Sequence, residues 1–212
     1  MGTITALKFQ QRNKERVNVY LDGEYAFALT ALEAARLRKG QVLSDAETAA
    51  LRTQDERQQA FERVVRFLSY RPRSRAEVER YLHDKGIAGE VIADVVERLE
   101  QTNYLDDEAF ARFWVENREE FKPRSRHALR YELRQKGVDN QVIARALSEA
   151  DDEAAAWHAV EGRLSRWASL PRDELRQKMA SYLSRRGFNY GIIILIFEKA
   201  CQVLDTEDNG ID

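Results

Sequence analysis

The hexapeptide Tyr70-Arg71-Pro72-Arg73-Ser74-Arg75 recurs as Phe121-Lys122-Pro123-Arg124-Ser125-Arg126. Both copies read aromatic, cation, Pro, Arg, Ser, Arg. A second matched pair follows them, Lys85-Gly86-Ile87 and Lys136-Gly137-Val138. All of these pairs are offset by the same 51 positions, so the chain contains an internal repeat.

The local chemistry of each hexapeptide predicts a tight turn between two helices. Proline pushes the residue before it out of the α-helical region, so the preceding helix must end there. Ser74 and Ser125 are good N-caps for the next helix, and Ser74-Arg75-Ala76-Glu77 matches a capping box. Gly86 and Gly137 stand where a helix C-cap is expected. The fold class is therefore predicted to be mainly α, built from tandem three-helix repeats.

A third, divergent copy follows the first two. Arg186-Gly187-Phe188 aligns with Lys136-Gly137-Val138 at an offset of 50, but Asp173-Glu174 stand near the place of the Ser-Arg pair. A divergent last copy is expected at the end of a repeat array. The predicted repeats are residues 60–105, 106–150 and 153–204, followed by a flexible tail at 205–212.

Residues 1–56 are predicted to form a separate extension of strands and helices. Three segments read as strands of a β-meander, with Asp22-Gly23 as the hairpin turn between the second and third. Thr30 and Ser44 each begin a capping box for a helix. The second of these helices is expected either to run as far as the first hexapeptide or to break near Asp55, with Arg52–Gln59 as the best candidate linker.

Composition limits the function classes. The net charge of the 212 residues is only −2, so any recognition of anions must come from local patches. The single Cys201 excludes an intramolecular disulfide and fits a reducing cytosol. No stretch reaches the roughly 20 apolar residues of a membrane span, and the apolar run Gly191–Phe197 is read as a buried terminal helix. A cytoplasmic protein without a membrane partner is expected.

Clustered cations are the candidate functional residues. Arginines crowd the two helix starts, and a helix N-terminus flanked by arginines is a good receiver of anions. Arg126, Arg130 and Arg134 also fall at i, i+4 and i+8, so they form one ridge. The alternatives are a solvated face for the arginines and capping of the preceding helix by Arg71 and Lys122. The candidate filament- or DNA-binding residues are Arg71, Arg73, Arg75, Lys122, Arg124, Arg126, Arg130 and Arg134.

The sequence lacks a recognisable catalytic, cofactor or metal site. His83, His127 and His158 are scattered without partners at ligand spacing. Cys201 has no evident base, and Asp106-Asp107-Glu108 is explained by a helix N-terminus. The expected protein is therefore not an enzyme, and no catalytic residue, cofactor or metal ligand is assigned. The three tryptophans, Trp114, Trp157 and Trp167, are expected in the core.

Together these motifs resemble the RecX family of regulatory proteins. The residues that carry the resemblance are the two Pro-Arg-Ser turns, the two Lys-Gly stops and Tyr104-Leu105-Asp106-Asp107-Glu108-Ala109-Phe110-Ala111. The match is strong over residues 60–150 and weaker over 153–204. The resemblance implies a curved array of three-helix repeats that acts as a monomer. It also implies binding in the groove of RecA–DNA filaments, with inhibition of recombinase, ATPase and coprotease activities and weak contact with single- or double-stranded DNA.

Two other functions remain open from the residues themselves. The chain could be a freestanding DNA-binding protein, with basic helix starts on phosphates. It could also be a helical-repeat scaffold for another protein.

Overall fold

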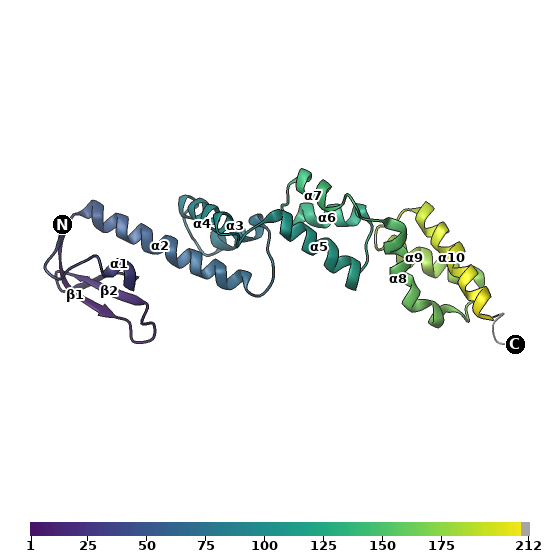
Figure 1. The fold of residues 1–212 in the computed structure, drawn as a ribbon, viewed down its shortest axis with the longest axis horizontal. Coiled ribbons are helices and arrows are strands. Elements are labelled where there is room, and N and C mark those ends of the chain that lie inside the picture. The colour runs from purple at the N-terminus through teal and green to yellow at the C-terminus, as the bar shows by residue number, and fades with distance from the viewer. Residues whose placement is uncertain (209–212) are drawn as a thin grey trace. The chain divides into compact units, whose positions relative to one another are not determined.

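The structure is a computed structural model that describes residues 1–208. They form two compact units. The first contains Met1–Arg71 and Val78–Leu105, and the second contains Pro72–Glu77 together with the chain from Asp106 onward. A small sheet lies at the start of the first unit, and helices make up the rest of both units (Figure 1).

The N-terminal sheet confirms the predicted meander and adds one short strand. Its strands are β1 (Gly2–Phe9), β2 (Arg16–Leu21), β3 (Glu24–Thr30) and β4 (Val42–Leu43), in the order β3-β2-β1-β4. All pairings are antiparallel. Asp22 and Gly23 adopt φ angles of 50° and 93°, as a type I′ hairpin turn requires. The two-residue strand β4 pairs with the start of β1 and is too short to show a period in the sequence.

Both predicted capping boxes in this region are present. Helix α1 (Ala31–Ala34) begins at Thr30, and helix α2 (Asp45–Leu68) begins at Ser44. The backbone N–H of Ser44 donates to the Glu47 carboxylate at 2.7 Å. This bond and a second one from the Ser44 hydroxyl lower the pKa of Glu47. Each helix start is thus fixed by its own sequence.

Helix α2 runs continuously for 24 residues, so the expectation that it reaches the first hexapeptide is confirmed, and the alternative of a break near Asp55 with a linker at Arg52–Gln59 is wrong. The linker contains neither Gly nor Pro, and its Gln, Glu and Arg residues favour helix. Asp55 is buried and forms a salt bridge with Arg16 of β2, while Gln59 Nε2 donates to the same carboxylate at 2.6 Å. The polar stretch therefore ties the helix to the sheet.

Three helix triplets follow the sheet, and each has its own apolar core. The remaining helices are α3 (Arg75–Asp84), α4 (Gly89–Gln101), α5 (Asp107–Phe121), α6 (Arg126–Gln135), α7 (Asn140–Ala146), α8 (Asp152–Trp167), α9 (Arg172–Ser184) and α10 (Tyr190–Asp208). The first triplet, α2–α4, buries Val64, Leu82 and Leu99. The second, α5–α7, buries Phe110, Leu133 and Leu147. The third, α8–α10, buries Leu164, Met179 and Ile196. The predicted tandem three-helix organisation is confirmed.

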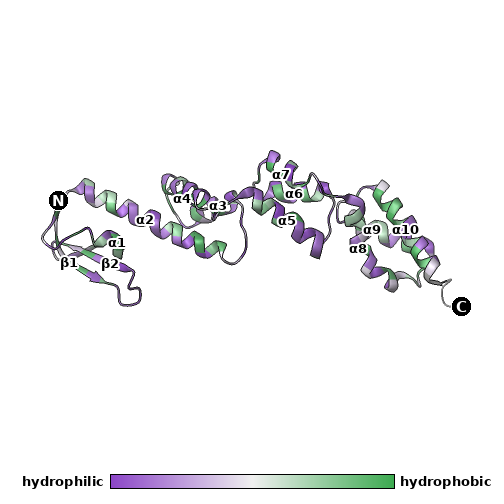
Figure 2. Cartoon of the chain, in the orientation of Figure 1, coloured by the Kyte–Doolittle hydropathy of each residue, from purple (hydrophilic) through white to green (hydrophobic). Residues whose placement is uncertain are grey.

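The last helix contains the apolar run that was expected to be buried. Ile193 and Ile196 are buried there, whereas Leu195 is 41% exposed. Figure 2 shows the strongly hydrophobic colouring of α10 beside the mixed colouring of the other helices. The tail expected from residue 205 is helical as far as Asp208, and residues 209–212 lie outside the described part of the chain.

We predict that Asp55→Ala destabilises the first unit by about 3–5 kcal/mol, because it leaves the Arg16 guanidinium buried without its counter-charge. The double change Arg16→Met/Asp55→Leu should cost much less, since it removes both charges. Urea unfolding measures both effects, with the exposed neighbour Glu56→Ala as the control. Equal losses for Asp55→Ala and Glu56→Ala would contradict the structural role of the pair.

Candidate functional site

Each Pro-Arg-Ser turn joins the first and second helices of a triplet and ends in a buried serine. Ser74 Oγ accepts from the Glu77 N–H at 3.2 Å, and Ser125 Oγ accepts from the Ala128 N–H at 3.1 Å. The two serines are 0% and 1% exposed. Ser74 N–H also donates to the Glu77 carboxylate at 3.3 Å, so the capping box predicted there is confirmed.

The same serines bind the end of a helix far along the chain. Ser74 Oγ donates to the carbonyl oxygen of Lys136 at 2.5 Å, and Ser125 N–H donates to the carbonyl oxygen of Arg186 at 3.1 Å. Lys136 and Arg186 are equivalent residues that precede Gly137 and Gly187. We call these contacts the first joint (Ser74 with Lys136-Gly137) and the second joint (Ser125 with Arg186-Gly187). Both joints lie inside the second unit.

Glycine is required at the joints for two reasons. Gly137 has a φ of +77°, and a Cβ there would lie 2.3 Å from the Cβ of Ala76. Gly187 has a φ of +87°, and its Cβ would lie 2.7 Å from Ser125 Oγ. Gly86 has a similar φ of +75°, but a Cβ added to it would meet nothing within 4 Å. Gly86 therefore only ends its helix. Gly137 and Gly187 end theirs too, and their missing side chains also leave room for the start of a preceding helix to pack against them.

Aspartates occupy the helix starts that were predicted to receive external anions. The backbone N–H of Arg75 donates to Asp107 Oδ1 at 2.7 Å, and that of Arg126 donates to Asp152 Oδ1 at 2.6 Å. Each of these two N-termini therefore already binds a carboxylate of the chain itself, and a binding role for the flanking arginines stays a prediction. The sequence signal that marks these carboxylates is the recurrence of Asp106-Asp107-Glu108 as Asp151-Asp152-Glu153.

Glu132 neutralises the arginine of the second turn. Its carboxylate lies 2.9 Å from Arg124 Nε and 2.8 Å from Arg118 Nε, and it accepts a hydrogen bond of 2.8 Å from Trp114 Nε1. The Glu132 side chain is only 18% exposed. Arg124 is thus an internally paired residue, although the sequence made it a binding candidate.

The ridge of Arg126, Arg130 and Arg134 is exposed on α6, as predicted. Within residues 1–208 no salt bridge involves any of the three. Arg134 Nε donates to the neutral Asn140 at 2.9 Å. Like charges at this spacing repel one another, so the ridge is a local concentration of uncompensated positive charge.

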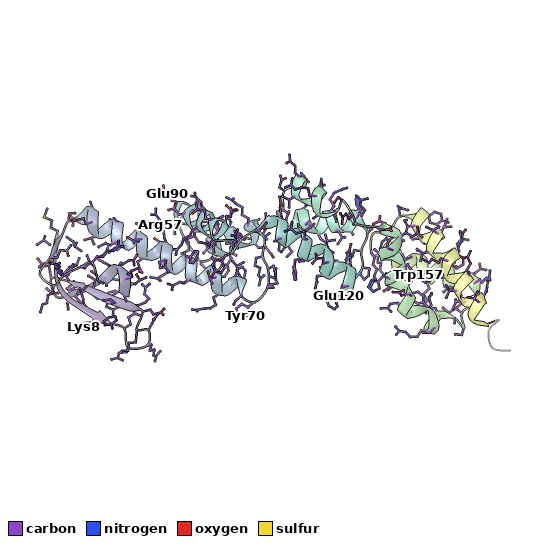
Figure 3. All side chains as sticks on the ribbon, in the orientation of Figure 1. Lys8, Arg57, Tyr70, Glu90, Glu120 and Trp157 are labelled. Carbon is purple, nitrogen blue, oxygen red and sulfur yellow. The ribbon has the colours of Figure 1, made fainter. Side chains whose placement is uncertain are left out.

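The other candidates have mixed surroundings. Arg71 and Arg73 are half-buried, whereas Arg75 and Lys122 are exposed. The aromatic residues that open the two hexapeptides, Tyr70 and Phe121, are 79% and 70% exposed. Figure 3 labels Tyr70 beside the end of α2.

The chain has three histidines and one cysteine as further candidates for chemistry. His83, His127 and His158 are exposed, and Cys201 is half-buried, with burial raising the pKa of its thiol. Across residues 1–208, no group of three or more His, Cys, Asp or Glu side chains has the geometry for a metal ion. None of the described helices is long and apolar enough to cross a membrane. Trp167 is buried as predicted, but Trp114 and Trp157 are only half-buried.

Models of one protein family match most of the chain. The "Regulatory protein RecX N-terminal domain" matches residues 2–44, and the first, second and third three-helix domains of RecX match residues 60–99, 106–147 and 151–194. The third match falls on the divergent repeat.

Individual relatives agree with these matches. "Regulatory protein RecX" of Bacillus subtilis (strain 168) is 37% identical over 198 residues, which cover 91% of this chain and 75% of the relative. The protein of the same name from Bacillus licheniformis is 34% identical over 218 residues, which cover 100% of this chain and 81% of the relative. A solved structure, "Crystal structure of regulatory protein RecX", matches with a TM-score of 0.72 and 27% identity over 93% of this chain and 100% of that chain.

We predict that Gly137→Ala destabilises the second unit more than Gly86→Ala destabilises the first. Both changes place a side chain at positive φ, which costs roughly 1–2 kcal/mol. Only Gly137→Ala also forces the methyl group against Ala76. Urea unfolding combined with hydrogen exchange, which reports on each unit separately, measures the difference. Equal losses in the two variants would show that the first joint does not need close approach.

Proposed function

Because the chain belongs to the RecX family of regulatory proteins, we propose that it binds RecA–DNA filaments in their groove and restrains them. The proposal includes slower filament growth, strand exchange, ATP hydrolysis and coprotease activity. The protein would act in the cytoplasm as a monomer, by binding rather than by turnover of its own.

The arginine ridge of α6 is the observation that carries this proposal. Arg126, Arg130 and Arg134 are exposed and lack a salt bridge among the described residues, so their charge is available to a partner. Arginine suits bidentate contact with carboxylate or phosphate better than lysine does. A filament of recombinase on DNA offers both groups.

The other repeats supply a contrast for the ridge. The equivalent positions are Arg75, Glu79 and His83 in the first triplet, and Arg176, Ala180 and Ser184 in the third. The full cationic ridge thus belongs to the second triplet. A face that merely kept the array soluble would have no reason to gather like charges in one repeat, because they repel.

Freestanding DNA binding through basic helix starts is the weaker alternative. That function needs free backbone N–H groups at the starts of α3 and α6. Asp107 and Asp152 already accept hydrogen bonds from the N–H groups of Arg75 and Arg126. A scaffold for some other protein would leave the concentrated charge of the ridge without a purpose.

We predict that changing Arg126, Arg130 and Arg134 together to Glu leaves the fold intact but strongly weakens inhibition of the recombinase. Exposed substitutions usually change the free energy of unfolding by about 0.5 kcal/mol or less each. Binding to the filament should also lose part of its salt dependence, since fewer ionic contacts remain. Circular dichroism checks the fold, and titration of recombinase ATPase activity checks inhibition.

The matched control for this triple change is Arg12, Lys14 and Lys39 to Glu. These exposed cations lie in the N-terminal part of the first unit, and their replacement alters the net charge by the same amount. The control should inhibit like the parent. A folded ridge variant that inhibits as well as the parent would rule out the ridge as the contact surface.

A further inference from the structure

The two joints carry equivalent cations but differ in their acids. Arg186 of the third triplet stands where Lys136 stands in the second, at an offset of 50. Arg163 stands where Arg118 stands, at the offset of 45 that also relates Asp106-Asp107-Glu108 to Asp151-Asp152-Glu153. In the first joint, Glu77 pairs with Lys136 at 2.8 Å, and Glu132 pairs with Arg118 at 2.8 Å. The residues equivalent to these two acids in the second joint are Ala128 and Tyr182. The second joint has therefore kept the cations and lost both carboxylates.

The cations of the second joint are gathered on one tyrosine ring. The Arg186 guanidinium carbon lies 3.8 Å from the centroid of the Tyr182 ring, and that of Arg163 lies 4.8 Å from it. Arg163 Nε also donates to the Tyr182 hydroxyl at 2.8 Å. Trp167 packs edge-on against the same ring, with 5.6 Å between the centroids. Tyr182 thus replaces a carboxylate with an aromatic support that holds both guanidinium groups in place.

The resulting cluster is short of negative charge. Burial lowers the pKa of Arg186, and the positive charges of Arg163, Arg124 and Arg185 lower it further against the opposing effect of Tyr182. Within the described chain, no salt bridge involves Arg163, Arg185 or Arg186. Arg186 Nε is buried without a hydrogen-bond partner. Glu132 is already shared between Arg118 and Arg124.

An arrangement of this kind is unfavourable unless an anion is present. A buried donor without a partner loses its hydration and gains nothing in return. Cation–π contact with one tyrosine offsets only part of the repulsion between two guanidinium groups. The first joint shows how the fold removes this cost internally, with two carboxylates. The second joint has neither of these carboxylates at the equivalent positions.

We infer that the second joint is a phosphate-binding site, in which Arg163 and Arg186, supported by Arg185, bind phosphate groups of a nucleic-acid strand. A phosphate group presents several acceptor oxygens, and consecutive phosphates along a strand replace two separate carboxylates. Arginine forks match phosphate in bidentate geometry. This site is built from α8, the end of α9 and the second turn, so it is distinct from the ridge on α6. It concerns the isolated chain and does not depend on recombinase binding.

Thermal unfolding at constant ionic strength tests the site directly. The melting temperature is measured while sodium pyrophosphate, or in a second series a short oligothymidylate, replaces part of the sodium chloride in increasing amounts. The Tm of the parent should rise, because a ligand that binds only the folded state stabilises it. Arg163→Gln/Arg186→Gln should weaken this binding by at least about tenfold, since charge-assisted hydrogen bonds are the strong ones. The control Arg166→Gln/Lys178→Gln changes two exposed cations of α8 and α9 and should keep the parent's response.

A second variant introduces into the second joint a carboxylate equivalent to Glu77 of the first joint. Ala128→Glu places a carboxylate at the position equivalent to Glu77, opposite Arg186. It should raise the Tm in chloride and reduce the gain from pyrophosphate, because the internal acid competes with the ligand. This variant keeps every arginine, so its result does not depend on whether the double Gln variant folds well.

Parallel titrations with different ligands identify the kind of anion that the site binds. Oligothymidylate should bind more tightly than pyrophosphate, since a strand offers several phosphates. Tighter binding of an oligoglutamate peptide, with the same dependence on Arg163 and Arg186, would overturn the assignment to phosphate. Equal responses of the parent, the double Gln variant and Ala128→Glu would show that the second joint holds no anion site.

Discussion

The second unit depends on one kind of contact, a hydrogen bond from a buried serine to the backbone carbonyl oxygen of the residue before a glycine. Ser74 reaches Lys136, and Ser125 reaches Arg186, through the same structural position in successive triplets. Three neighbouring features then follow. Glycine must come next because the turn approaches the position of its missing side chain. The serine must also cap its own helix, and an aspartate of the next triplet must complete the cap. The Pro-Arg-Ser turn of one triplet and the cation-glycine helix end of the next therefore form the two sides of one joint.

The joints also decide which charges are available at the surface. Carboxylates around the first joint neutralise Lys136, Arg118 and Arg124, so several of the arginines and lysines near the turns are structural. The ridge on α6 has no comparable acids among the described residues. In tandem repeats each unit is stabilised mainly by its neighbours. Exposed side chains that form no salt bridge with a neighbour are free to differ between repeats, and the side chains of the ridge are of this kind.

The sequence predicted what is encoded locally. The Asp22-Gly23 hairpin, the boxes at Thr30, Ser44 and Ser74, and the glycine stops each depend on a few consecutive residues. The contacts that span long distances could not be predicted this way. Ser74 and Lys136 are 62 positions apart, and Arg16 and Asp55 are 39 apart. Asp55 shows the consequence, because a polar residue in a polar stretch indicated a linker, and only its distant partner reveals a buried salt bridge. The same distinction holds for the candidate arginines. The helical spacing within α6 predicted the ridge, but it did not predict that Arg124 pairs with Glu132.

Membership of the RecX family and an unpaired ridge lead to one central proposal, that the protein binds recombinase-coated DNA in preference to bare DNA. The most direct measurement compares its affinity for bare single-stranded DNA and for RecA-coated DNA across one salt titration. The account predicts a clear preference for the coated filament that persists as salt is raised, with only weak binding to bare DNA. Tight binding to bare DNA, with a steep salt dependence and no gain from the recombinase, would contradict it.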